Sequence, residues 1–332
     1  MAIMNPNDER IFAQAAAWSA TTAATLVTAD GLQVRSVSLT GKTNAIQSQV
    51  KTGSLGRSVG RRGRRVASFS LSVPLKGSGT AGTPSDIDQI LGAVFGVTTG
   101  TVVVATSVTY GITEANIGLT IGRFRDPAGS NVWNQILHGG LVDSVEISFG
   151  GEEEAFITVS GPAVDVIDKP NFASNPAYGL GAFPTEPSAP TFLGLSALAF
   201  VGSITINGVS TFKLSSGTIK ATFARAIRPS FGTYYADVPV SSIRTIAIDF
   251  TIYEEDTAAM AALRQLARTV GSCDVVMVMG DVAGNINTFT IKNTTFPEPD
   301  SQQSDQESML SFSATAAATS AALNDEFKLV QT

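Results

Sequence analysis

Few residues of this chain have side chains suited to chemistry. The sequence contains one histidine, His138, and one cysteine, Cys273. A nucleophile or general base needs a second group to orient it, and neither residue has such a partner at a recognisable spacing. A single cysteine cannot form an intramolecular disulfide, and no cysteine or histidine cluster provides a zinc site. We therefore expect no catalytic residue, no metal and no cofactor, and we predict that the chain is not an enzyme.

Two other patterns have only a superficial likeness to active sites. Three consecutive acids, Glu152, Glu153 and Glu154, have the residue type for acid–base or metal chemistry, but consecutive residues at a hairpin tip point in different directions. A solvated or interface turn accounts for them better. The segment 76–84 (KGSGTAGTP) is glycine-rich like a phosphate loop, yet its lysine lies at the wrong end to reach a phosphate at the helix start. We interpret it as a flexible crossover.

The segment 53–65 (GSLGRSVGRRGRR) concentrates positive charge among glycines. It is open to three interpretations: a solvated loop, a nucleic-acid contact, or a loop that becomes ordered on assembly. The second is weakened because no aromatic residues are interleaved to stack on bases. We favour the third, with the arginines pairing with acids of a neighbouring subunit, such as 152–154, Asp300, Asp305 or Glu307. The predicted inter-subunit or inter-ring contact residues are Arg57, Arg61, Arg62, Arg64, Arg65, Glu152, Glu153 and Glu154.

Composition limits the class of protein. A length of 332 residues exceeds the usual size of one domain, so two domains are expected. Hydrophobic residues make up 43% and charged residues only 15%, which indicates a compact protein with a weakly charged surface. The net charge of −6 disfavours binding to a phosphate backbone. No segment approaches the roughly 18 apolar residues of a membrane-spanning helix, so we expect neither export nor membrane insertion.

The order of predicted elements repeats along the chain. In each half an alternating strand (69–75, 246–252) precedes one helix. The first helix is expected after an N-cap at Thr83 and ends at Gly96, and the second begins at Asp256 or Thr257 and ends at Gly271. Further short strands are expected at 102–110, 116–124, 142–149, 155–160, 274–279, 288–296 and 309–316.

This repetition indicates an all-β fold with one short helix per domain, in two tandem β-sandwich or barrel domains. We predict an N-terminal arm at 1–30, a first domain at 31–168, a proline-rich linker at 169–192 and a second, duplicated domain at 193–332. The segment before Gly31 is rich in alanine and threonine, and is equally compatible with a short helix and an extended arm.

The run FSLSVPLKGSGTAGTPSDIDQILGAVFG (69–96) resembles the tail tube, or major tail, proteins of siphophages, in which a strand, a Gly/Thr/Pro loop and a short amphipathic helix follow one another. The segments TSVTYGITEANIGLTI (106–121) and LHGGLVDSVEISFGGEEEAFITVSGP (137–162) are similar to the hairpin and closing strands of that family. The resemblance covers 30–168 closely and extends to 195–330 through the order of elements. It implies two tail-tube-like domains whose inner strands join across subunits into a barrel around a channel.

The resemblance also implies a function and partners. The chain would be a structural subunit of a long non-contractile phage tail, whose stacked rings form a hollow tube that delivers DNA as non-sticking cargo. Rings would be trimeric with pseudo-sixfold symmetry if the domain is duplicated, or hexameric if the second half is a decoration. Other partners would be a tip initiator, a terminator and a tape measure in the lumen, and the location would be the virion tail, assembled in the host cytoplasm.

Two alternatives remain open on the sequence. One is another virion structural protein, such as a head decoration or neck component. The other is a ligand-binding β-sandwich, which would normally show clustered exposed aromatic residues, whereas Trp18 and Trp133 lie far apart in this sequence.

Overall fold

The computed structural model describes residues 9–46, 61–125, 134–150, 154–172, 182–190, 192, 194, 196–198, 201–233, 235–303, 307–320 and 324–332. Strands predominate in these ranges, where the α-helices are α1 (Asp88–Phe95), α2 (Lys169–Phe172) and α3 (Ala258–Arg268). The predicted all-β fold with little helix is confirmed. The strands of the described ranges pair in open, antiparallel sheets rather than a closed barrel. None of the described helices has the length and hydrophobicity needed to cross a membrane.

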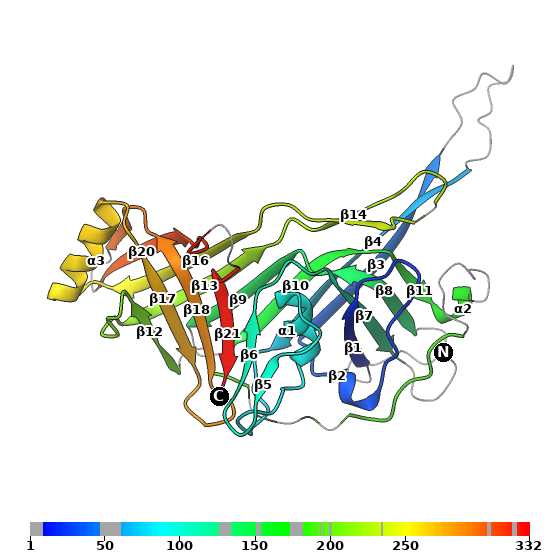
Figure 1. The fold of residues 1–332 in the computed structure, drawn as a ribbon, viewed down its shortest axis with the longest axis horizontal. Helices are drawn as coiled ribbons and strands as arrows, with labels where there is room; N and C mark the ends of the chain where they lie inside the picture. Colours follow the sequence, from blue (N-terminus) through cyan, green and yellow to red (C-terminus); the bar gives the residue numbers. More distant parts are fainter. Residues whose placement is uncertain are drawn as a thin grey trace, which may run out of the picture.

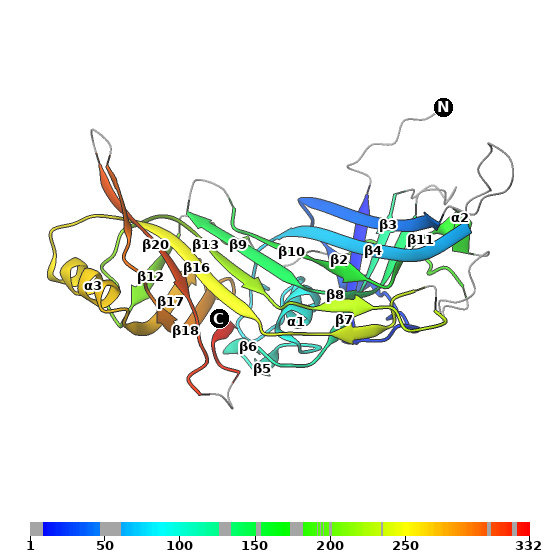
Figure 2. The same cartoon turned by 90° about the horizontal axis from the view of Figure 1, so that it is seen from above.

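One large sheet runs through both halves of the chain, and we call it the platform sheet. Figure 2 shows its strands side by side, with every neighbouring pair antiparallel. A short strand, β19 (Asp300–Gln303), pairs with the far side of the last platform strand. In spatial order the platform strands are β3 (Ser36–Ile46), β4 (Arg61–Pro74), β10 (Phe156–Ala163), β9 (Ser144–Gly150), β13 (Leu214–Thr222), β16 (Thr245–Tyr253) and β20 (Ser308–Thr315).

Two smaller sets of strands cover one face of the platform sheet (Figure 1). Over the first half lies a five-stranded sheet in the order β11 (Asp165–Asp168), β8 (Gln135–Leu141), β7 (Ile117–Phe124), β1 (Arg10–Ala17) and β2 (Gly31–Leu32). Over the second half the order is β12 (Gly202–Ile206), β17 (Ser272–Met279), β18 (Asn287–Thr295), β21 (Phe327–Gln331), β6 (Ser107–Gly111) and β5 (Thr101–Val103). This set is continuous with the platform sheet, because Thr295 of β18 pairs with Thr315 of β20. The β5–β6 hairpin of the first half therefore extends the outer sheet of the second half.

The two halves connect equivalent strands in the same order. In the platform sheet, β3-β4-β10-β9 of the first half corresponds to β13-β16-β20-β19 of the second. In the outer sheets, β1-β7-β8-β11 corresponds to β12-β17-β18-β21. The helices α1 and α3 each follow the second platform strand of their half. The repeated order indicates two similar halves. The domain boundaries at 168 and 193 stay predictions.

Alternation of apolar residues explains the strands. Along β16 the residues Ile246, Ile248, Phe250 and Ile252 are buried, while those between them are partly or fully exposed. Strands with this pattern bury one face against the outer sheets, in a single hydrophobic cluster that includes residues of both halves. The predicted strands at 246–252 and 274–279 lie within β16 and β17, and those at 69–75 and 309–316 extend one residue past the ends of β4 and β20.

The helix ends differ from the prediction in one place. Thr257 caps α3 as expected, and its side chain accepts a hydrogen bond from the Met260 N–H at 3.2 Å. The predicted cap at Thr83 is wrong, because α1 begins at Asp88 after Ile87. The Asp88 carboxylate points inward to the Tyr110 hydroxyl at 2.6 Å and the Gly100 N–H at 3.1 Å, which fixes the start of α1 beside the core.

Two other segments differ from, or go beyond, the sequence prediction. The expected strand at 102–110 is a hairpin, β5–β6, whose turn includes Ala105 in a left-handed conformation (φ 53). The segment before Gly31, left open between helix and extended chain, contains β1, which pairs along its whole length with β7.

A second hairpin links the halves in space. The chain between β13 and β16, residues 223–244, carries β14 (Ala226–Arg228) and β15 (Val238–Val240), and we call it the bridging hairpin. It leaves the second half and lies against the first (Figure 1). By the same strand order, its counterpart in the first half is the β3–β4 hairpin, which projects away from the body.

Candidate assembly surface

The face of the platform sheet opposite the core is lined by hydroxyl groups, and we call it the hydroxyl face. Along each strand a serine or threonine alternates with a buried apolar residue, so that hydroxyls from neighbouring strands lie side by side. Three charged residues, Glu146, Lys220 and Asp249, lie among them. The hydroxyl residues are Ser36, Ser38, Thr40, Ser68, Ser70, Ser72, Ser144, Ser148, Thr158, Ser160, Ser216, Thr218, Thr222, Thr245, Thr251, Ser311, Ser313 and Thr315.

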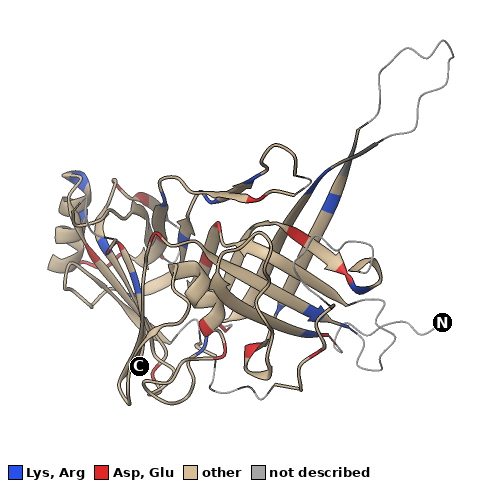
Figure 3. Cartoon of the chain, turned by 45° about the vertical axis from the view of Figure 1, so that its right-hand side comes forward, with Lys and Arg blue, Asp and Glu red and all other residues tan. Residues whose placement is uncertain are grey.

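This face carries little net charge. Lys220 Nζ lies 3.8 Å from Asp249 Oδ2, so these two opposite charges of the face balance each other. Figure 3 shows acidic and basic residues scattered thinly over a chain that is mostly uncharged. The platform sheet therefore presents a broad, polar and weakly charged surface to its surroundings.

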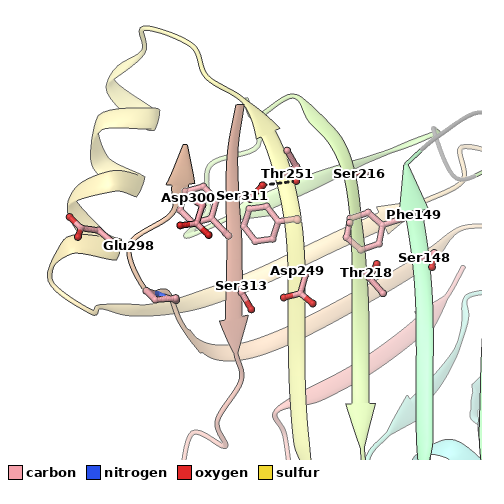
Figure 4. A pocket seen from close by; sticks show the side chains of 14 residues that line it. Ser148, Phe149, Ser216, Thr218, Asp249, Thr251, Glu298, Asp300, Ser311 and Ser313 are labelled. Carbon is pink, nitrogen blue, oxygen red and sulfur yellow. Dashed lines mark hydrogen bonds between the residues drawn. The ribbon is translucent and has the colours of Figure 1, made fainter. Parts of the chain in front are cut away.

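A shallow hollow of ≈590 Å³ lies on the hydroxyl face, across β9, β13, β16 and β20 (Figure 4). Small side chains leave this space, and Thr251 Oγ1 lies 3.0 Å from Ser311 Oγ at one end of it. Gly217 is required in the floor, because a Cβ there would lie 2.3 Å from the Phe149 ring. Glu298 and Asp300 lie at the rim near β19. The hollow is a shallow depression over paired strands, and its described lining residues do not place a nucleophile in contact with a general base.

The arginine-rich segment lies only partly within the described residues. Arg57 falls outside them, and Arg61 and Arg62 are described as part of the β4 backbone alone, opposite Ile46 and Ala45. Arg64 Nη2 donates to the Ser230 carbonyl of the bridging hairpin at 3.3 Å. The β3–β4 hairpin therefore contacts the bridging hairpin near the end of its described part.

Arg65 has an intramolecular partner. Its guanidinium forms an ion pair with Asp165, whose side chain is fully buried, and donates to the Val166 carbonyl at 2.6 Å. It also donates to Thr43 Oγ1 at 3.3 Å. These contacts fix the base of the β3–β4 hairpin to β11.

Within the described part of the chain, no contact joins the predicted acidic residues to these arginines. Glu152 and Glu153 lie outside the described residues, as does Asp305. Glu154 is exposed, and its backbone forms an isolated bridge to Leu198. Their roles in contacts between subunits stay predictions.

His138 and Cys273, the other residues considered for chemistry, are both buried. His138 lies in β8, is fully buried, and its Nε2–H donates to the Ala20 carbonyl at 2.9 Å. Burial lowers the pKa of His138 and raises the pKa of the Cys273 thiol to about 11. Burial also raises the pKa of Asp88. In the described part of the chain no three histidine, cysteine or acidic side chains gather into a metal site.

Sequence reasoning missed Arg225, which attaches the bridging hairpin to the first half. It is 6% exposed, and its Nη1 donates to the carbonyls of Val142 at 3.2 Å and Ala93 at 3.3 Å. Its backbone N–H donates to Asp143 Oδ1 at 2.6 Å. Burial lowers the pKa of Arg225, and the nearby positive charge of Arg244 lowers it further. All three partners are distant in sequence, so no local pattern marks this arginine.

Comparison with known families adds one finding. Residues 11–316 match the family described as phage tail tube protein, a range that includes both halves and the platform sheet up to the end of β20. No curated protein matches the chain.

Proposed function

The chain belongs to the phage tail tube protein family, and from this we propose that it builds the tube of a long non-contractile tail by self-association into stacked rings. The observation that carries the proposal is the platform sheet, which joins both halves and presents one continuous hydroxyl face. A protein that encloses a channel needs such an unbroken, weakly charged surface on one side.

We propose that the hydroxyl face lines the channel through which DNA passes. Phosphates bind to clustered lysine and arginine with the release of counterions, and this face offers Lys220 beside Asp249 instead of a basic cluster. Serine and threonine hydroxyls keep the wall hydrated without holding the cargo. DNA is then cargo that moves past the wall and does not adhere to it.

The repeated strand order supports a ring of three copies, in which each copy supplies two tube-like domains and the ring has pseudo-sixfold symmetry. A hexameric ring with the second half as an outer decoration is the alternative. In either arrangement a tip initiator, a terminator and a tape measure are the expected further partners, and the virion tail, assembled in the host cytoplasm, is the expected location.

The arginine-rich hairpin fits a contact between subunits or rings in this proposal. Arg65 also holds the base of this hairpin against β11. Arg57, Arg61, Arg62, Arg64 and Arg65 stay the arginines proposed to meet acids of a neighbour. Glu152, Glu153 and Glu154 are the proposed acidic partners.

Negative-stain electron microscopy of the purified chain at high concentration, with and without a tail-tip template, tests the proposal. Hollow tubes with three-fold end views are the expected result, and six-fold end views would favour the hexameric arrangement. A chain that forms no tube even on the template would refute the proposed function.

A further inference from the structure

A phenylalanine lies in solvent at the tip of the bridging hairpin. The Phe231 side chain is fully exposed, in the turn between β14 and β15. Single exposed apolar residues are common on protein surfaces, so exposure alone does not make Phe231 a binding residue. The turn around Phe231 distinguishes it, because hydrogen bonds hold that turn in one conformation.

The turn is fixed by two side chains on either side of Phe231. The Asp237 carboxylate accepts hydrogen bonds from the Ser230 N–H at 2.8 Å and from Ser230 Oγ at 2.6 Å. Thr233 Oγ1 lies 3.1 Å from the Ser230 carbonyl oxygen and 2.9 Å from that of Tyr235. A side chain presented on such a pre-organised loop loses little conformational entropy when it binds, which is the property of an aromatic anchor in an interface.

A second hollow, of ≈350 Å³, opens at the other end of the β9–β13 pair, and we call it the end pocket. The bridging hairpin leaves β13 after Thr222, whereas the end pocket is lined by the first residues of β13 and the last residues of β9. Methionines in the lining let the pocket adapt to the shape of an inserted side chain. Its apolar lining includes Phe149, Val201, Phe212, Leu214, Met277 and Met279.

Positive charge lies beside the Phe231 tip. Arg64 is exposed, and its Nη2 donates to the Ser230 carbonyl at 3.3 Å, which places the arginine-rich β3–β4 hairpin next to the turn. Arg228, the last residue of β14, is exposed as well. An acidic partner surface would therefore complement the surroundings of the tip.

Negative charge lies beside the end pocket. The backbone of the exposed Glu154 forms a bridge to Leu198, whose carbonyl accepts a hydrogen bond from the N–H of the lining residue Val201 at 3.1 Å. Lys213, which also lines the pocket, is balanced by Glu255, with 2.6 Å between Nζ and Oε1. The tip and the pocket therefore match in both apolar character and charge.

We propose that Phe231 of one copy inserts into the end pocket of a copy in the adjacent ring. This inference rests on the proposed function and specifies a contact by which rings stack. The tip and the pocket lie at opposite ends of the platform strands, so a chain does not fill its own pocket and the contact is head to tail. In a tube whose platform sheets lie side by side around the channel, these strand ends face the rings above and below. The insertion also brings Arg64 towards Glu154 of the neighbouring copy.

Replacing the anchor tests this contact. Burial of a phenylalanine side chain strengthens an association by about tenfold or more, so Phe231→Ala should raise the concentration needed for long tubes by at least that factor. Single rings should still appear in electron micrographs. Ile243→Ala removes another exposed apolar side chain, 89% exposed and outside the tip, and should leave that concentration unchanged. Both variants should unfold in urea like the original chain, because neither side chain is buried.

Cysteines identify the partner surface. In a Cys273→Ala background, one preparation carries Phe231→Cys and a second carries Ser203→Cys, which lines the end pocket. Tubes assembled from the mixture should give a dimer with a short thiol cross-linker, while neither preparation alone should do so. Ser210→Cys in place of Ser203→Cys is the matched control and should not cross-link, because Ser210 is exposed beyond the far end of β12.

A charge exchange tests the flanking contact. Arg64→Glu should raise the concentration needed for tubes, because two acids would then meet at the contact. Glu154→Arg in the same chain should restore assembly, since every contact in the tube would regain opposite charges. A double variant that assembles no better than Arg64→Glu would contradict the proposed approach of these two residues.

The outcomes separate this inference from the proposed function. An unchanged assembly concentration for Phe231→Ala, or a mixture without cross-linked dimers, would overturn the inference while tubes of the unsubstituted chain preserve the proposed function. Loss of rings as well as tubes in Phe231→Ala would place the contact within a ring and would also overturn it. Failure of the unsubstituted chain to form tubes on a template would overturn both.

Discussion

Replacing Arg65 by methionine keeps much of the side chain and removes its charge. The Asp165 carboxylate is fully buried and would lose the guanidinium, while the Val166 carbonyl would lose its donor at 2.6 Å. Breaking a buried ion pair from one side costs about 3–5 kcal/mol. Because 21% of the Arg65 side chain is exposed, we expect the lower end, about 3 kcal/mol less free energy of unfolding.

The assay is urea unfolding followed by circular dichroism, at a concentration at which the chain is monomeric. The slope of the transition should stay constant while its midpoint falls. Arg65→Met combined with Asp165→Leu removes both charges and should recover stability to within about 1 kcal/mol of the original chain. Arg64→Met is the surface control, with an expected change within about 0.5 kcal/mol.

The reasoning is refuted if Arg65→Met costs less than about 1 kcal/mol, since the carboxylate would then need no cation. It is also refuted if the double substitution is as unstable as the single one. In that case packing, and not the buried charge, would hold the β3–β4 hairpin against β11.

Three further predictions concern other parts of the chain. Val270 follows α3 in a left-handed conformation (φ 51) and is 65% exposed, so Val270→Gly should raise the free energy of unfolding by about 1 kcal/mol in urea titrations, and a loss of stability would contradict this. Burial lowers the pKa of His138 from 6.5, so the unfolded chain binds the proton more readily; stability should be complete above pH 6.5 and fall as the pH decreases below it. Replacing His138 by glutamine should flatten that dependence in unfolding curves measured from pH 8 to pH 5, and an unchanged slope would assign it to other groups. Ser148→Lys, Thr218→Lys and Ser313→Lys together should leave tube formation intact but slow DNA release in a salt-dependent manner, and unchanged release would place the hydroxyl face outside the channel.

The strands that bury one face were predictable because their apolar residues alternate. Phe69, Leu71 and Val73 in β4 and the isoleucines of β16 show that period directly. Strand β1 gave no such signal, since alanines dominate its sequence (RIFAQAAA) and are small enough for either a helix or a strand. The turn in the β5–β6 hairpin was missed because Ala105 adopts a left-handed conformation without glycine or asparagine.

The candidate surface was less predictable. The alternation of hydroxyl residues along 68–72 and 144–148 was available as a signal, but only strand order shows that these segments share a face with 311–315. Apart from Thr43, the partners of Arg65 and Arg225 are distant in the sequence: Asp165 is 100 residues from Arg65, and Ala93 is 132 residues from Arg225. Contacts of that separation depend on the fold as a whole, which local patterns do not specify.

Strands of one half pair with strands of the other half, and this has a consequence for genetic recombination between phages. The β5–β6 hairpin of the first half completes the outer sheet beside β21, and β13 of the second half extends the platform sheet beside β9. A recombination event near residue 190 could join the first half of this protein from one phage to the second half from another. The two halves would then have to match at both pairings at once, β6 with β21 and β9 with β13. The two halves should therefore be inherited as a block, and hybrids between diverged relatives should fail to fold before they are ever tested in a tail.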